Sequence, residues 1–335
     1  MGRAPYLIRF QVSGIVSFLG MREIITLFFI VALLFFPFET YGKKKPRVDF
    51  SSAEEYVQQL FIEIRETKDD SLAIRLHRQI EDILVKTLVI PEAYQHKFDS
   101  LGMIGKIYAP RKDFRILNWN HSSRDGTFRY FALMVIPGKK DEPNKVIRLT
   151  ETTDSIYRPD QQTLDANQWL GCLYYKIIPK RRGKDGIDYY ALLGLDMNNL
   201  KTKKKYIEIL SFDVNGNPQL GAPIIEFNKW TKHRVIFEFS ARQSMYLEYN
   251  RFRRRIEMDH LAPPMPYLVG EYEYYEADQF RDALKFKRGK WKHIRDIEKP
   301  KDMKVKKKSL PKPPKPSKRP PQKGRLEKKT DEDII

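Results

Sequence analysis

Between residues 187 and 261, short apolar runs alternate with turn-forming residues about every ten positions. The runs are Tyr189–Leu195, Tyr206–Phe212, Ile224–Phe227, Val235–Phe239, Met245–Tyr249 and Ile256–His260. The breaks between them are rich in Asn, Asp, Gly and Pro, as at residues 196–199 and 215–218. This spacing is typical of antiparallel strands joined by hairpins, so it predicts the centre of an antiparallel β domain.

Apolar side chains at every second position predict further strands outside this stretch. One strand face is formed by Phe128, Tyr130, Ala132, Met134 and Ile136. Leu173–Ile178 and Trp291–Ile294 have similar character and predict two more strands. The later strands have no helical pattern between them, which argues against a parallel α/β sheet. An antiparallel meander, closed into a barrel or forming a strongly curved sheet, is the simplest prediction.

The segment before these strands has a helical period instead. One helical face is formed by Ala53, Tyr56, Val57, Leu60, Phe61 and Ile64. Ser51 or Ser52, with a glutamate three residues later, predicts a capping box at the start of this helix.

A second helix is predicted to begin near Asp69 or Asp70 and to end before Pro91, which opens a third, shorter helix. The predicted fold class is therefore α+β. A helical segment over residues 43–110 packs on a large antiparallel β domain over residues 111–298.

Residues 1–42 read as an N-terminal extension followed by an export signal. Ile24–Phe36 is apolar except for Thr26, and its thirteen residues are short for a bilayer helix. Arg22 before the run and Gly42 after it fit the charged start and the cleavage site of a signal peptide. An uncleaved anchor over residues 24–38 is the alternative, and Met21 competes with Met1 as the start of the protein.

The formal charge of +19 is concentrated at the two ends of the sequence. Residues 299–335 have fourteen Lys or Arg against five Asp or Glu, a charge of +9, together with seven prolines. Such a composition buries too little apolar surface to fold, so it predicts a disordered tail. The tail residues expected to attract a polyanion are Lys306, Lys307, Lys308, Lys312, Lys315, Lys318 and Arg319. In an exported protein that polyanion is an anionic envelope polymer or a membrane surface, with nucleic acid the less favoured partner.

Three residues are candidates for catalysis, each with a structural alternative. Asp196 and Asp213 lie in predicted hairpin turns, where aspartate also serves the turn itself. His260 follows Asp259, but neighbouring strand residues point to opposite faces, so these two side chains are not expected to pair. His260 shares its face with Ile256 and Met258, which predicts a partly buried histidine with a backbone partner. A hydrolase or lyase would require at least two of the three candidates in one polar cleft.

Aromatic residues beside carboxylates predict a sugar or protein contact. Tyr272 and Tyr274 alternate with glutamates. A carbohydrate platform would require Tyr272, Tyr274 or Trp291 to be exposed, with the exposed rings coplanar. Strand packing is the structural alternative. Cys172, the only cysteine, lies in an apolar run and is expected to be a buried thiol. We identify no cofactor motif and no metal-ligand spacing, so we predict neither a cofactor nor a metal.

Four segments together resemble a group of uncharacterised exported proteins of Bacteroidota bacteria. They are residues 189–199, 212–218, 234–240 and 259–263. The resemblance covers roughly residues 50–298 and implies an exported location in a Gram-negative envelope, without implying an activity or a ligand. We therefore expect a non-enzymatic binding or structural protein of the envelope, with the tail attaching it to an anionic surface. The enzyme and the carbohydrate-binding module are the alternatives.

Overall fold

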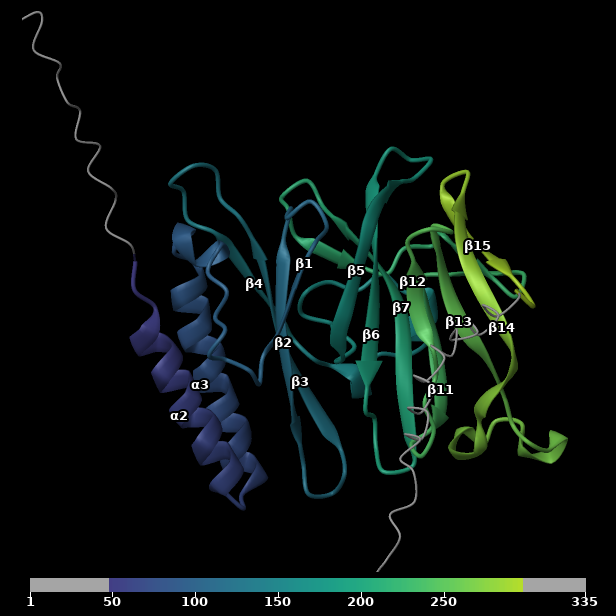
Figure 1. Ribbon diagram of the computed structural model, residues 1–335, viewed down its shortest axis with the longest axis horizontal. Helices are drawn as coiled ribbons and strands as arrows, with labels where there is room; N and C mark the ends of the chain where they lie inside the picture. The colour runs from purple at the N-terminus through teal and green to yellow at the C-terminus, as the bar shows by residue number, and fades with distance from the viewer. Residues whose placement is uncertain (1–47, 298–335) are drawn as a thin grey trace, which may run out of the picture. The chain divides into compact units, whose positions relative to one another are not determined.

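The structure is a computed structural model that describes residues 48–297, and its helices and strands belong to the unit that begins at Phe50. The predicted signal or anchor at 24–38 and the predicted tail at 299–335 lie outside the described residues. Within them, no helix has the length and apolar character needed to cross a membrane. Over residues 48–297 the fold is α+β, with two α-helices before the strands (Figure 1).

Both α-helices lie where the sequence predicts them, but the predicted helical segment over residues 43–110 also contains the first strand, at Gly105–Tyr108. Helix α2 spans Ser51–Glu66, α3 spans Asp70–Leu88, and a short 3-10 helix, η1, spans Pro91–Tyr94. The Asp69 side chain accepts a hydrogen bond from the Ser71 backbone N–H, which fixes the start of α3.

The predicted capping box is wrong. Phe50 occupies the cap position of α2, and its side chain makes no cap hydrogen bond. The Glu54 carboxylate bonds instead to His96 Nε2 at 2.6 Å and to the Ser100 hydroxyl, tying the helix to the chain after η1. The Glu54 carboxylate, which a capping box would need, therefore makes tertiary contacts instead.

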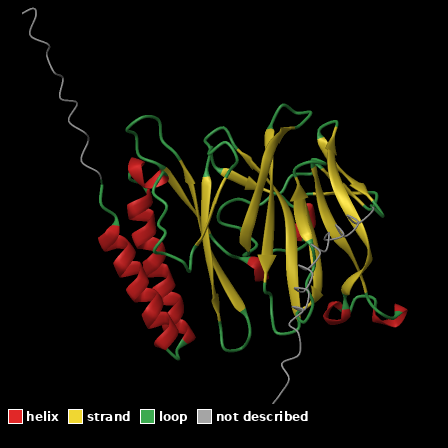
Figure 2. Cartoon of the chain, in the orientation of Figure 1, coloured by secondary structure: helices red, strands yellow, loops and turns green. Residues whose placement is uncertain are grey.

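The strands form three sheets (Figure 2). The first sheet contains β1 (Gly105–Tyr108), β2 (Arg115–Ser122), β3 (Phe128–Ile136) and β4 (Lys145–Leu149). The middle sheet contains β5 (Leu173–Arg182), β6 (Asp188–Asp196), β7 (Thr202–Phe212), β8 (Pro218–Leu220) and β11 (Arg234–Ser240). The third contains β9 (Ile225–Phe227), β10 (Trp230–Lys232), β12 (Leu247–Asn250), β13 (Arg255–Ala262), β14 (Glu276–Lys287) and β15 (Lys290–Ile294). The paired strands are antiparallel except for β15 with β9.

A single barrel-like or strongly curved meander was therefore the wrong prediction. The reason lies in β6 and β7, which are apolar on both faces. Tyr190 and Leu192 face one core with residues of the first sheet such as Tyr130, whereas Ala191 and Leu193 belong to a second core with residues of the third sheet. A sheet with two apolar faces must be covered on both sides, so the strands divide into stacked sheets.

The first sheet is also covered on both faces. Tyr130, Ala132 and Met134 face the core shared with the middle sheet, as their alternation predicted. On the other face, Phe131 stacks on His77 of α3, with ring centroids 4.8 Å apart. Trp119 donates a hydrogen bond from Nε1 to His77 Nδ1 at 3.2 Å, so the helices are joined to the sheet by polar as well as apolar contacts.

A buried ion pair lies inside the middle sheet. Arg234 Nε donates to Glu208 Oε1 at 2.7 Å, and both side chains are almost fully buried. The Tyr174 hydroxyl also donates to Glu208, and Arg234 Nη2 donates to the Leu220 carbonyl at 2.9 Å. Because partner groups surround both charges, the pair fixes the register of β7, β8 and β11 without leaving a charge unpaired.

The buried His77 predicts a measurable pH dependence of stability. Burial, reinforced by His121 and Arg78, lowers the pKa of His77 from its ordinary 6.5 to about 3. The unfolded chain takes up this proton below pH 6.5 and the folded protein does not until about pH 3. The free energy of unfolding should therefore fall as pH drops through that window, by up to about 1.4 kcal/mol per pH unit. Denaturant titrations at several pH values measure this free energy. Between pH 6.5 and 3 it should fall less steeply with pH in His77→Gln than in the wild type, and equal pH slopes in the two proteins would contradict this account.

Candidate functional site

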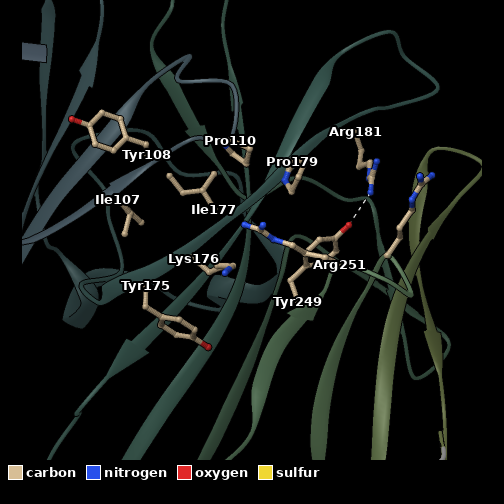
Figure 3. A pocket seen from close by; sticks show the side chains of 11 residues that line it. Ile107, Tyr108, Pro110, Tyr175, Lys176, Ile177, Pro179, Arg181, Tyr249 and Arg251 are labelled. Carbon is tan, nitrogen blue, oxygen red and sulfur yellow. Dashed lines mark hydrogen bonds between the residues drawn. The ribbon is translucent and has the colours of Figure 1, made fainter. Parts of the chain in front are cut away.

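A pocket of about 760 Å³ lies where the three sheets meet at their edges. Strand β1 is an edge of the first sheet, β5 an edge of the middle sheet and β12 an edge of the third. The pocket, called here the cationic pocket, is lined by Ile107, Tyr108, Pro110, Tyr175, Lys176, Ile177, Pro179, Arg181, Tyr249, Arg251 and Arg254 (Figure 3).

The pocket lining contains four basic side chains and no carboxylate. Lys176 and Arg181 come from β5, and Arg251 and Arg254 come from the turn between β12 and β13. Figure 3 shows Lys176, Arg181 and Arg251 gathered around Tyr249. Like charges repel one another at such spacing, so a bound anion would stabilise the arrangement.

Arg181 occupies the most constrained position of the four. Its Nη2 donates to the Tyr249 hydroxyl at 3.0 Å, which holds the guanidinium over the third sheet's edge strand. Its Nε is buried and has no hydrogen-bond partner among the described residues. A buried N–H without a partner costs about 1–3 kcal/mol, so the site is incomplete without an acceptor.

The tyrosines of the pocket serve as walls. The Tyr175 hydroxyl donates to the Leu247 carbonyl at 2.8 Å, and the Tyr108 hydroxyl donates to the Tyr94 carbonyl at 3.1 Å. Burial raises the pKa of Tyr175 above its ordinary value of 10. The lining has no His, Asp, Glu, Ser or Cys, and its basic side chains lie beside tyrosine rings, an arrangement that is suited to holding an anion.

The β5–β6, β7–β8, β12–β13 and β14–β15 turns lie at the same end of the sheets, at the top of Figure 1. The turn between β12 and β13 reads Arg251-Phe252-Arg253-Arg254 and leads directly into Arg255. A Cβ on Gly289, in the β14–β15 turn, would lie 2.7 Å from Lys184 Cγ, so that turn packs closely against the β5–β6 hairpin. Lys145 Nζ donates to the Asn215 carbonyl at 2.7 Å and joins β4 to the β7–β8 turn. We call this group of tips the basic end.

The three candidates for catalysis do not share a site. Asp196 ends β6 beside the start of β7, whereas Asp213 follows the last residue of β7, at its opposite end. His260 lies in the third sheet. The polar cleft that a hydrolase or lyase would need is therefore not formed by these residues.

Asp196 is a buried structural acceptor. Its carboxylate accepts from the hydroxyls of Tyr130 at 2.9 Å and Tyr206 at 3.0 Å, and from the Asn198 backbone N–H at 2.7 Å. The last bond is the expected turn chemistry. The two tyrosines add a link between the first sheet and the middle sheet that the sequence did not reveal.

Asp213 and His260 have ordinary partners. The Asp213 carboxylate accepts from the backbone N–H groups of Asn215 and Asn217, which confirms its turn role, and these bonds lower its pKa. His260 is exposed, and its Nδ1 lies 2.7 Å from Asp278 Oδ2, so the expectation of a partly buried histidine with a backbone partner was wrong. Asp259 does not contact His260, as the strand alternation predicted. Its carboxylate accepts a hydrogen bond from Arg281 instead.

The predicted carbohydrate platform does not include Trp291, which is buried. Tyr272 and Tyr274 are both half-exposed on the short helix η5 (Tyr272–Tyr274). Tyr272 packs against Tyr275 with the rings tilted by 50°, so these two rings are not coplanar. Tyr274 lines a separate polar pocket of about 400 Å³ with residues of both charges, among them Lys201 and Glu273.

The remaining reactive groups are buried or dispersed. Cys172 is a buried free thiol, as expected, and burial raises its pKa. Among residues 48–297, no group of three or more His, Cys, Asp or Glu side chains is placed to hold a metal ion.

Sequence reasoning missed the cationic pocket. The formal charge is concentrated at the two ends of the sequence, so the charge pattern does not point to the folded part. The run Arg251–Arg255, with four arginines in five residues, was the available signal. This run lies near Lys176 and Arg181 only because the middle sheet packs against the third sheet, and the local sequence pattern does not specify that packing.

No protein-family model matches the sequence, and comparisons with curated proteins and with solved structures gave no match.

The structural role of Asp196 predicts a loss of stability on truncation. Asp196→Ala should lower the free energy of unfolding by about 3 kcal/mol, because two buried tyrosine hydroxyls lose their charged acceptor. Urea titration followed by circular dichroism measures the change. Asp213→Ala, in an exposed turn, is the matched control and should cost about 1 kcal/mol or less. Equal effects of the two substitutions would remove the structural assignment.

Proposed function

We propose that this protein is a non-enzymatic binding protein of the cell envelope whose β domain holds an anionic ligand in the cationic pocket. The observation that carries the proposal is a pocket with four basic side chains, no carboxylate and a buried, unpartnered Arg181 Nε. Phosphate and carboxylate groups are the acceptors that a guanidinium and an ammonium group bind best. The tyrosine rings favour a ligand with an apolar or ring-shaped portion next to its charge.

The exported location remains part of the proposal and rests on the sequence alone. The apolar run at 24–36 would direct the chain out of the cytoplasm, and the Lys/Pro tail after residue 298 would add a second, sequence-independent attraction to polyanions. Both basic regions favour the same class of partner, an anionic polymer or surface of the envelope.

The pocket predicts a specific loss of anion binding. Lys176→Gln with Arg181→Gln should weaken binding to heparin, used as a model polyanion, by about tenfold at low salt. The slope of log affinity against log salt concentration should become shallower by about 1.5, because two ionic contacts are lost. Isothermal titration calorimetry of the full-length protein at several salt concentrations measures both quantities.

A matched control separates the pocket from general charge. Lys68→Gln with Lys86→Gln removes the same charge from exposed positions on the helical segment that do not line the pocket. This variant should bind within about twofold of the wild type. If the two double variants lose affinity equally, the pocket is not the binding site and the tail or the general surface charge is.

The location can be tested independently of the ligand. Fractionation of producing cells should place the protein in the envelope, and its N-terminal sequence should begin after Gly42 if the leader is removed. Intact protein that begins at Met1 or Met21 and is found in the membrane fraction would favour the anchor over 24–38. Intact protein recovered only from the cytosol would contradict export.

A further inference from the structure

The apex of the β12–β13 hairpin presents an aromatic ring to solvent. Phe252 is 101% exposed, so its side chain has no cover from the described residues. Arg251 and Arg254, on either side of it, are exposed and form no ion pair with another described residue. Arg253 and Arg255 face Glu257, at 4.0 Å and 2.7 Å. Glu257 therefore offsets only part of the charge of the four arginines, and the hairpin keeps a strong positive charge.

A second bare apolar side chain lies at the same end. Val214 in the β7–β8 turn is also 101% exposed, and Lys145 ties this turn to the first sheet. Lys184 in the β5–β6 hairpin and Arg288 in the β14–β15 turn are exposed cations on neighbouring tips, and neither forms an ion pair with another described residue. These turns also contain Asp185 and Asp213, so their positive charge is concentrated on residues 251–255 and on Arg288. Exposed apolar apices beside such charge have the composition of segments that lie in a membrane interface.

We propose that the basic end is a membrane-contacting surface for anionic lipid, with Phe252 entering the interface and the cationic pocket facing the headgroups. This inference rests on the proposed function and identifies an anionic lipid surface as the binding partner. Arginines attract an anionic leaflet from a distance of about one Debye length, which is ~8 Å at physiological salt. On contact, the Phe252 ring enters the boundary between the lipid headgroups and the acyl chains. Removing the surface of the ring from water there stabilises the bound state.

A lipid surface fits these observations better than a soluble polymer does. A hydrated polyanion would satisfy the arginines but would leave Phe252 and Val214 in water. Only a partner that offers both negative charge and an apolar layer uses the two features together.

A single label can report insertion directly. Cys172 is the only cysteine and is buried, so Phe252→Cys provides one accessible thiol for an environment-sensitive fluorophore. In the full-length protein, vesicles of phosphatidylcholine with about 30% phosphatidylglycerol should shift the emission of this probe to shorter wavelength. Pure phosphatidylcholine vesicles should leave it unchanged. The control is Tyr267→Cys on η4 (Pro266–Leu268), whose residue is 80% exposed and whose label should not shift.

Substitution tests the energetic role of the ring. Phe252→Ser should reduce the partition of the protein onto the anionic vesicles by about tenfold, and Tyr267→Ser should not change it. Because the Lys/Pro tail is present in every variant, its attraction to the vesicles cancels in the comparison.

The outcomes separate the two proposals. If Lys176→Gln with Arg181→Gln loses heparin binding while the probe at 252 does not respond to anionic vesicles, the pocket binds a soluble anion and the membrane surface is refuted. If the probe shifts and Phe252→Ser leaves heparin binding unchanged, the membrane surface stands. A shift of equal size with neutral vesicles would also contradict the proposal, because charge would then play no part.

Discussion

The middle sheet has two apolar faces, and the rest of the structure depends on covering both of them. Strands β6 and β7 send alternate large side chains into opposite cores, so one sheet packs on each side. The first sheet then needs its own cover, which α2 and α3 provide through contacts such as Phe131 with His77. This stacking brings the edge strands β1, β5 and β12 to one place and thereby creates the cationic pocket.

Two buried charged groups hold the sheets and strands together. Arg234 is surrounded by Glu208 and backbone carbonyls, and Asp196 by two tyrosine hydroxyls and a backbone N–H. Such groups lock the packing of sheets and strands because leaving one partner unpaired in the core is costly. The pocket arginines differ from Arg234 in having no carboxylate partner: no ion pair joins Arg181, Arg251 or Arg254 to another described residue, and the lining contains no Asp or Glu. Their charge is not neutralised within the described residues, as the proposed anion binding requires.

The candidate site was only partly accessible from the sequence. Turn chemistry at Asp213 followed from its neighbours, because an Asx turn is a local interaction over four residues. The exposed position of His260 and its contact with Asp278 did not follow, since its partner lies 18 residues away on β14. The same holds for the pocket: its basic residues come from β5 and from a hairpin about 70 positions later, and they meet only because Tyr249 and Arg181 face each other across two sheets.

The sequence by itself determined the α+β class, both α-helices and the strands with clear alternation, but it did not reveal strands such as β1, β4 and β14. Period-two and period-3.6 patterns reflect which side of each element is apolar, and that is a local property of strands and helices. Only the tertiary structure decided that the strands divide into three sheets, that Glu54 turns away from its helix cap, and that the basic tips gather at one end. These outcomes depend on which apolar face covers which other face. That choice is made by the packing of the whole chain, because several pairings satisfy the same local pattern equally well.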